Sequence, residues 1–174
     1  MSCIKPWIFR AQLAVLGFVF RIDDAVAQTS DPAAPNTVRQ WLQRNDCRVH
    51  QPAKDPLETQ PPPASLTRGR FRGTSQHDWA ALCSRRDASL LLVFRGGRAE
   101  HIDTLEISAV PPPAGRGIYA APPSEVRMYS SMLGDSLAAD TVWMTHDGIV
   151  DSEGCCGIVW FWHAGRWRQL PGPD

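Results

Sequence analysis

The amino-acid sequence predicts an α+β domain, a mainly antiparallel β-sheet with one or two short helices and proline-rich loops. Two observations lead to this class. Short apolar segments come in pairs joined by polar turns, which is typical of β-hairpins. Only two stretches have the pattern of a helix, and both are short. Because no internal repeat is visible, we expect residues 36–174 to form a single domain.

The first predicted element is a helix that ends near residue 45. Asn36 or Thr37 can cap its N-terminus. Val38, Trp41 and Leu42 follow at i, i+3 and i+4 spacing, which places them on one face of the helix. We expect this helix to pack on the sheet. The residues before it, 28–35, are small and polar and suit a flexible N-terminus of the mature chain.

Strands are predicted in the middle of the chain. Residues 51–65 carry five prolines, which exclude a helix or an interior strand, so we expect a surface loop there. Residues 66–72 then alternate between polar and apolar. Residues 78–84 and 89–94 flank a charged turn and predict a hairpin whose second strand is buried on both faces. A further strand is predicted over 102–110, where a run of prolines ends it.

The C-terminal part predicts a helix and a second hairpin. The helix covers residues 124–133, and residues 141–144 are a candidate for a short strand. The clearest hairpin of the sequence has its strands at 157–163 and 166–170, joined by a tight Ala-Gly turn.

Three tryptophans lie in this last hairpin, and two of them, Trp160 and Trp162, share one face of a strand. Val159 and Phe161 lie on the other face. Indole rings stack on sugars, so a carbohydrate platform is one interpretation. Tryptophans at alternate strand positions more often belong to a core, and this is the interpretation we favour.

The first 27 residues have the three parts of an export signal. A basic segment with Lys5 and Arg10 precedes a ten-residue apolar run, 11–20, and an A-x-A pattern ends at Ala27. Ten residues in a helix span about 15 Å, roughly half of a bilayer core, so we expect no membrane anchor. We predict cleavage before Gln28 and a periplasmic or secreted protein. The alternative is an N-terminal helix buried in the fold.

The mature chain is nearly neutral. Removal of 27 of the 174 residues takes three basic and two acidic side chains and leaves 147 residues with 15 basic and 16 acidic ones. Binding to nucleic acid or to an anionic membrane needs a strong positive field. We therefore expect no nucleic-acid partner.

The mature chain has four cysteines, an even number that predicts disulfides in an exported protein. Cys47 ends the first helix and Cys83 lies in a predicted strand, so the preferred bridge is Cys47–Cys83. Cys155 and Cys156 are adjacent and can bond to each other only through a strained ring. If Cys47 and Cys83 are bonded, Cys155 and Cys156 either form that ring or stay reduced. The alternative is that each pairs with one of the distant cysteines.

Residues 145–151 resemble a degenerate calcium-binding loop, in which Asp147 and Asp151 are the remaining acids. His146 and the neighbouring cysteines add nitrogen and sulfur donors that suit zinc or copper. The favoured interpretation is a β-turn whose aspartates accept hydrogen bonds from backbone amides, with no cofactor. The alternative is a divalent metal at these residues, and with it a metal-binding protein or metal-dependent hydrolase built on 145–163.

Arg68, Arg70 and Arg72 alternate, so on a strand all three would project from one face. Such a row is a candidate contact for a small anion or a phosphate-bearing polysaccharide. It is more often a solvated strand face that discourages aggregation.

Residues 134–137 spell the G-D-S-L nucleophile block of a lipase and esterase family. That family also needs an aspartate three residues before a histidine, and none of the histidines here has one. A serine without an oriented base is a poor nucleophile, so we name no catalytic residue.

Four blocks, at 69–73, 77–84, 146–149 and 165–167, resemble exported bacterial proteins to which no activity has been assigned. The resemblance implies export and no particular reaction. We expect a non-enzymatic binding or interaction module of the bacterial envelope, whose partner is an envelope or extracellular protein or a glycan.

Overall fold

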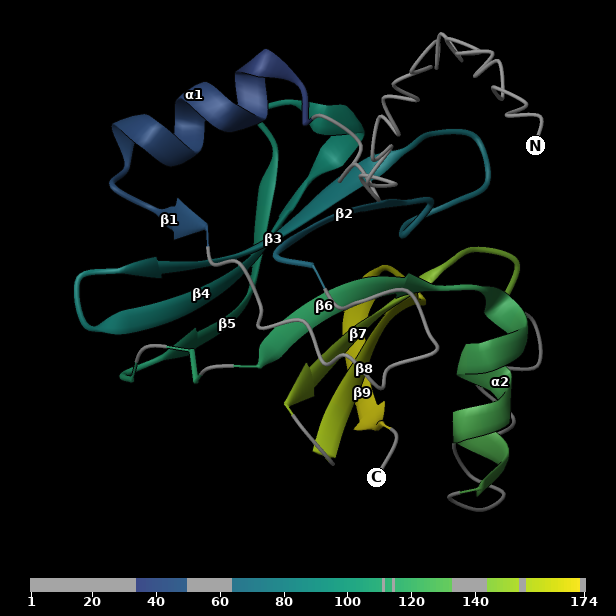
Figure 1. Ribbon diagram of the computed structural model, residues 1–174. Helices are drawn as coiled ribbons and strands as arrows, with labels where there is room; N and C mark the ends of the chain where they lie inside the picture. The colour runs from purple at the N-terminus through teal and green to yellow at the C-terminus, as the bar shows by residue number, and fades with distance from the viewer. Residues whose placement is uncertain are drawn as a thin grey trace, which may run out of the picture.

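Two antiparallel β-sheets and two α-helices make up the described part of the chain, which confirms the predicted α+β class. The structure is a computed structural model that describes residues 34–49, 64–110, 112–113, 115–132, 144–153 and 156–172. Figure 1 shows the two sheets side by side, with one helix over each of them. The sequence predicted one sheet, whereas the strands divide into two.

The first sheet contains five strands. β3 is the central strand. It pairs with β4 on one side, and β1 and β2 pair with different parts of its other side. β5 pairs with the free side of β4. The strands are β1 (Arg48–Val49), β2 (Leu66–Gly69), β3 (Asp78–Arg85), β4 (Ala88–Phe94) and β5 (Ile102–Ser108). The predicted hairpin is confirmed as β3–β4.

The second sheet has four strands in the order β6-β7-β8-β9. They are β6 (Arg116–Ala121), β7 (Gly148–Glu153), β8 (Cys156–His163) and β9 (Arg166–Pro171), and the last two confirm the predicted C-terminal hairpin. The helices are α1 (Asn36–Arg44) and α2 (Pro123–Met132), close to their predicted bounds. The predicted cap is absent, because residue 35 at the N-cap of α1 is a proline without a capping side chain.

An apolar layer fills the space between the sheets. Ala80, Leu82, Leu91 and Val93 of the first sheet form one cluster with side chains of the second, and each of these four is fully buried or nearly so. The partners from the second sheet are Ile118, Ile149 and Trp160. This layer is the centre of the fold, since both sheets contribute to it.

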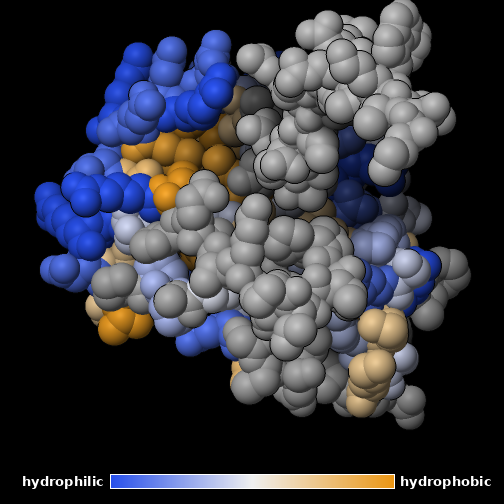
Figure 2. All heavy atoms as spheres, in the orientation of Figure 1, coloured by the Kyte–Doolittle hydropathy of each residue, from blue (hydrophilic) through white to orange (hydrophobic). Residues whose placement is uncertain are grey.

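The helices cover the outer faces of the sheets. Val38 and Leu42 of α1 pack on the first sheet, where the Trp41 ring meets the edge of Phe94 at 5.4 Å between centroids. Figure 2 shows the same arrangement as hydrophobic side chains between the hydrophilic outside of α1 and the sheet. β4 is thereby buried on both faces, as the sequence predicted. Val126 of α2 packs on the second sheet.

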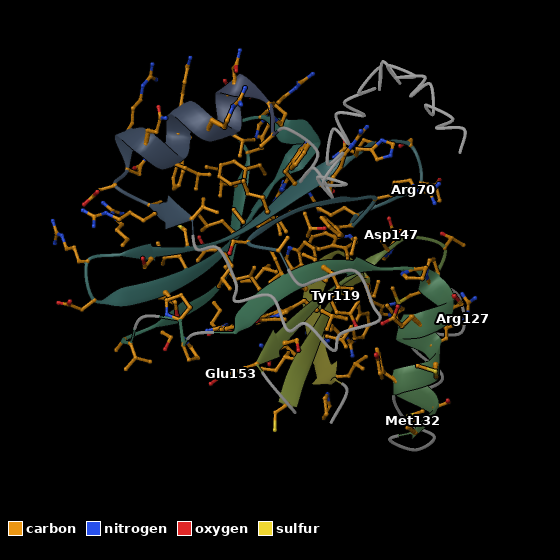
Figure 3. The ribbon with its side chains drawn as sticks, in the orientation of Figure 1. Arg70, Tyr119, Arg127, Met132, Asp147 and Glu153 are labelled. Carbon is orange, nitrogen blue, oxygen red and sulfur yellow. A yellow bond between two sulfur atoms is a disulfide. The ribbon has the colours of Figure 1, made fainter. Side chains whose placement is uncertain are left out.

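Hydrogen bonds fasten α2 to β6. The hydroxyls of Tyr119 and Tyr129 both donate to Glu125, at 2.8 and 3.1 Å, and Figure 3 shows Tyr119 between β6 and the helix. Burial raises the pKa of both tyrosines, with the Glu125 charge acting in the same direction. Both phenols therefore remain donors to the carboxylate at ordinary pH.

The segment before β2 joins the two sheets. Ala64 and Ile118 exchange two backbone hydrogen bonds of 3.0 and 2.6 Å, which link this segment to β6. β2 itself ends at Gly69, three residues before the predicted end. A side chain at Gly69 would lie 2.4 Å from the ring of Phe71, which turns inward and is fully buried.

Three strands were not predicted: β1, β6 and β7. Residues 145–151 were predicted as a turn, but β7 begins at Gly148 and lies inside the second sheet. The sequence did not indicate this strand, because it begins with a glycine and contains Asp151. This charged residue is buried only because Arg116 of β6 neutralises it. Met144 belongs to no strand, and the rest of the short strand predicted at 141–144 lies outside the described residues.

Several other predictions also fall outside the described residues. They are the leader at 1–27, most of the flexible segment 28–35 and of the loop 51–65, the G-D-S-L block at 134–137, and Cys155. Within the described part of the chain, no helix is both long and apolar enough to cross a membrane.

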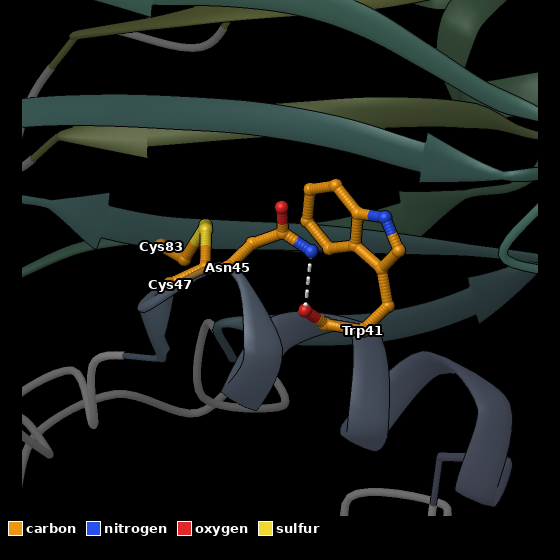
Figure 4. The surroundings of a disulfide bond; sticks show 4 residues. All are labelled: Trp41, Asn45, Cys47 and Cys83. Carbon is orange, nitrogen blue, oxygen red and sulfur yellow. Dashed lines mark hydrogen bonds between the residues drawn. A yellow bond between two sulfur atoms is a disulfide. The ribbon is translucent and has the colours of Figure 1, made fainter.

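The preferred disulfide is present. Cys47 follows the end of α1, Cys83 lies in β3, and the bond between them closes a separation of 36 residues (Figure 4). Asn45 donates from its side chain to the carbonyl of Trp41 at 2.8 Å and so helps to end the helix directly before the bridge. The disulfide fixes α1 to the centre of the first sheet. Cys156 is exposed at the start of β8.

A buried ion cluster ties the sheets together at one end of the apolar layer. Arg116 of β6 donates to both oxygens of Asp151 of β7, at 2.9 and 2.6 Å. It also donates to Glu106 of β5 at 2.9 Å and lies 3.4 Å from Ser89 of β4. The hydrogen bonds and charge of Asp151, with those of Glu106, raise the pKa of Arg116 although burial opposes this. The cluster is fully paired.

Removal of the disulfide tests its part in stability. On the loop-entropy account, closing a loop of this size contributes about 3–4 kcal/mol. We expect the Cys47→Ser/Cys83→Ser double variant to lose that amount in equilibrium urea unfolding. A reducing agent should destabilise the wild type and leave the double variant unchanged. Equal sensitivity of both proteins to the reductant would contradict the assignment.

Breaking the buried ion cluster tests the link between the sheets. Arg116→Met leaves Asp151 buried without its cation, so we expect a loss of about 3–5 kcal/mol in the free energy of unfolding. The double variant Arg116→Met/Asp151→Leu removes both charges and should be clearly more stable than the single one. Denaturant unfolding of the three proteins measures this. A double variant as unstable as the single one would show that the charges are not coupled.

Candidate anion-binding site

Two connections of the first sheet meet at one of its ends and form a basic pocket. One is the loop between β2 and β3, and the other leads from β4 to β5 through a single 3-10 turn, η1 (Arg95–Gly97). The cavity has a volume of about 520 Å³. Its polar lining consists of Arg72, Gln76, His77, Arg95, Arg98 and His101.

The turn after β4 places two arginines in this pocket. The sequence from residue 95 is Arg-Gly-Gly-Arg, and Gly96 and Gly97 have φ values of +59° and +67°, which glycine adopts without strain. The Gly96 N–H donates to Asp78 at 2.8 Å, and the Arg95 N–H donates to the carbonyl of His101 at 2.9 Å. These bonds hold the turn closed, so Arg95 and Arg98 face the same cavity.

Asp103 lies next to the pocket and accepts hydrogen bonds from two residues of the surrounding structure. Arg95 donates to both oxygens of this carboxylate, through Nη2 and, at 3.0 Å, through Nε. The indole N–H of Trp167, on β9 of the other sheet, donates to it at 3.1 Å. Burial acts to raise the pKa of Asp103, but these hydrogen bonds and the charges of Arg95 and Arg72 outweigh it and lower the pKa. The same contacts raise the pKa of Arg95.

Arg72 is held between the two sheets. Its guanidinium carbon lies 3.9 Å from the centre of the Trp162 ring, a cation–π contact. Its Nε lies 3.9 Å from Asp103, too far for a hydrogen bond, and is buried without a hydrogen-bond partner in the described structure. The side chain is 21% exposed. Arg72 is thus fixed in place, and its side chain forms part of the pocket lining.

The pocket has an excess of positive charge. Three arginines line it, and no carboxylate is among the lining residues. Asp103 neutralises one of the arginines from below. Asp78 is fully buried, and its Oδ1 accepts hydrogen bonds of 2.8 Å from the Gly96 N–H and from the Gln76 amide, whereas its Oδ2 has no hydrogen-bond partner in the described structure. Guanidinium and imidazole groups donate hydrogen bonds to oxyanions, so the arrangement suits a phosphate, sulfate or carboxylate group.

The structure separates the three arginines that the sequence placed in one row. Arg68 is exposed on β2, and Arg70 and Arg72 lie beyond the end of that strand. Arg70 donates from its backbone N–H to Asp147 at 2.7 Å, and Figure 3 shows these two residues next to each other. Arg72 alone reaches the pocket. The predicted row fails because the pairing of β2 with β3 ends at Gly69 and Asp78, so Arg70 and Arg72 lie in the loop that follows.

The residues predicted to hold a metal are not brought together. Asp147 accepts a backbone N–H, as the favoured interpretation expected, but from Arg70 in a distant loop, whereas Asp151 lies in β7 and is bound by the side chain of Arg116. His146 belongs to the segment before β7. Among the described residues, no group of three or more histidine, cysteine, aspartate or glutamate side chains could hold a metal ion.

One tryptophan of the last hairpin lies in the core, as the sequence favoured, and the other two are half-buried. Trp160 is 7% exposed in the layer between the sheets, and Trp162 meets Trp167 edge to face at 5.6 Å between ring centroids. One face of Trp162 is covered by Arg72. These contacts disfavour a carbohydrate platform on this hairpin.

Sequence reasoning missed five polar residues of the pocket: Gln76, His77, Arg95, Arg98 and His101. One signal could have found two of them. The Arg-Gly-Gly-Arg segment directly after a buried strand predicts a tight turn that displays two arginines.

Comparison of the chain with protein-family models, curated proteins and solved structures gave no match. The function is therefore argued from the geometry of the pocket.

The pH dependence of stability tests the role of Asp103. Because folding lowers its pKa, its contribution is complete above the unfolded pKa of about 3.9 and is lost as the pH falls through the folded pKa. We expect Asp103→Asn to cost about 2 kcal/mol at pH 7 and progressively less below pH 4. Urea unfolding at pH 7, 5 and 3 measures the difference. Asp87→Asn, in an exposed turn, is the control, and a pH-independent loss in Asp103→Asn would contradict the role.

Proposed function

We propose that this protein is an exported, non-enzymatic binding module that captures a hydrophilic anion in the basic pocket. The observation that carries the proposal is the convergence of three arginines and two histidines on one cavity without a lining carboxylate. Asp103 neutralises one of these arginines, and a bound anion would neutralise further positive charge at the cavity. The anionic group is free or is part of an envelope glycan or an extracellular protein.

Export is supported by the leader and by the disulfide. The first 27 residues have the pattern of a cleaved signal. The Cys47–Cys83 bond suits an oxidising compartment, since the cytosol keeps thiols reduced. The resemblance of short blocks to exported bacterial proteins agrees with both. We assign the protein to the bacterial periplasm or the exterior.

Binding is favoured over catalysis because of what lines the pocket. Within the described lining there is no serine, threonine, cysteine or lysine to act as a nucleophile. No carboxylate lines it to orient either histidine as a base. The described lining therefore has groups that recognise an anion and lacks a carboxylate that would orient its two histidines for catalysis.

Calorimetric titration with sulfate tests anion binding. Arg98 is exposed, so its replacement leaves the core intact. We expect Arg98→Gln to weaken sulfate binding about tenfold or more, because one charge-assisted hydrogen bond is lost. Arg85→Gln is the matched control, since it removes an equal charge from an exposed position at the far end of β3. Equal effects of the two variants would contradict a specific pocket.

Mass spectrometry of the protein from its native envelope tests export. We expect an N-terminus at Gln28 and a mature chain of 147 residues that contains the Cys47–Cys83 bridge. A chain that keeps Met1 and has Cys47 and Cys83 reduced would overturn the assignment.

A further inference from the structure

We infer that the pocket takes a hydrophilic ligand that carries two or more adjacent oxyanion groups, of which a short polyphosphate chain is the simplest example. The inference rests on the proposed function and specifies its ligand class. It comes from the distribution of the donors, the size of the cavity and the chemistry of its lining.

The donors stand on two separate walls. The β2–β3 loop contributes Arg72 and His77, and the connection from β4 to β5 contributes Arg98 and His101. Arg95 lies between them in the chain, but its guanidinium is already engaged by both oxygens of one carboxylate. Each wall therefore offers one guanidinium and one imidazole, and a ligand with two linked oxyanion groups can place one against each wall.

The cavity is too large for one such group. A volume of about 520 Å³ falls within the range of about 300–1,000 Å³ that is typical of sites for drug-sized ligands. A single phosphate or sulfate has five non-hydrogen atoms and would leave most of this space to water. A chain of two or three linked groups could contact both walls at once.

The lining excludes ligands with a large apolar part. It consists of arginine, histidine, glutamine and glycine, without an aliphatic side chain among the described residues. A lipid chain would therefore find no apolar wall. The lining favours a ligand that is polar throughout.

Arg72 is positioned before the ligand arrives. Trp162 and Asp103 hold its side chain from two sides, and its buried Nε lacks a hydrogen-bond partner in the described structure. A preordered donor loses little conformational entropy on binding and so favours ligands whose groups match its position. Trp162, on β8, thus acts as a positioning residue for a pocket built on the other sheet.

The test compares anions of one chemistry at constant ionic strength. Orthophosphate, tripolyphosphate and ATP are titrated by calorimetry, and vesicles that contain phosphatidic acid are tested by cosedimentation. We expect tripolyphosphate to bind at least about tenfold more tightly than orthophosphate, because it reaches both walls. ATP should bind no more tightly than tripolyphosphate, and the vesicles should not retain the protein.

Variants locate the effect in the pocket. Arg98→Gln should remove most of the preference for tripolyphosphate over orthophosphate, whereas Arg85→Gln should keep it. Trp162→Leu should reduce the affinity for both anions, and Trp162→Phe, which retains an aromatic face, should restore much of it. Circular dichroism confirms the folding of each variant. A preference that survives in Arg98→Gln would overturn the two-wall arrangement.

The outcomes distinguish the ligand class from the proposed function. If none of the anions binds, sulfate included, the proposed function fails and this inference fails with it. If orthophosphate and tripolyphosphate bind equally, or if ATP or the vesicles bind more tightly than tripolyphosphate, the ligand class is overturned. The anion-binding function then stands.

Discussion

The carboxylate of Asp103 is the constraint on which the candidate site depends. It accepts hydrogen bonds from Arg95, which fixes the turn after β4, and from Trp167, which belongs to the other sheet. Its charge also lies beside Arg72. Without this carboxylate, several guanidinium groups would lie close together in a poorly solvated place and would repel one another. One buried acid thus joins the two sheets and allows the basic pocket to exist.

Two polar clusters, one around Arg116 and one around Asp103, flank the apolar layer between the sheets. They differ in their balance of positive and negative charge, and this difference indicates different roles. Around Arg116, two carboxylates surround one guanidinium, so every charge is paired and the side chain is only 10% exposed. Around Asp103, several guanidiniums surround one carboxylate, and the cluster opens into a cavity. Paired buried charges specify how the sheets pack. Excess charge beside a cavity is suited to bind an external counter-ion.

The elements that could be predicted are those whose sequence pattern is complete within a few neighbouring residues. The β3–β4 and β8–β9 hairpins and α1 carry their periodicity within a few residues, so the sequence indicates them. β6 and β7 do not, because each has glycine and a charged residue where an apolar residue would mark the strand. Arg116 and Asp151 become compatible with a sheet only when they meet, and their meeting is a tertiary event.

The sequence by itself determined the fold class, the two hairpins, the amphipathic helix and the preferred Cys47–Cys83 pair, since each rests on periodicity or on a count of residues. Only the tertiary structure decided which cations form a site. Arg72 is separated from Arg68 because the pairing of β2 with β3 ends at Gly69, and it is brought to Arg95 and Arg98 by the pairing of β3 with its neighbours. No local pattern encodes that contact, because it depends on packing between residues that are distant in the chain.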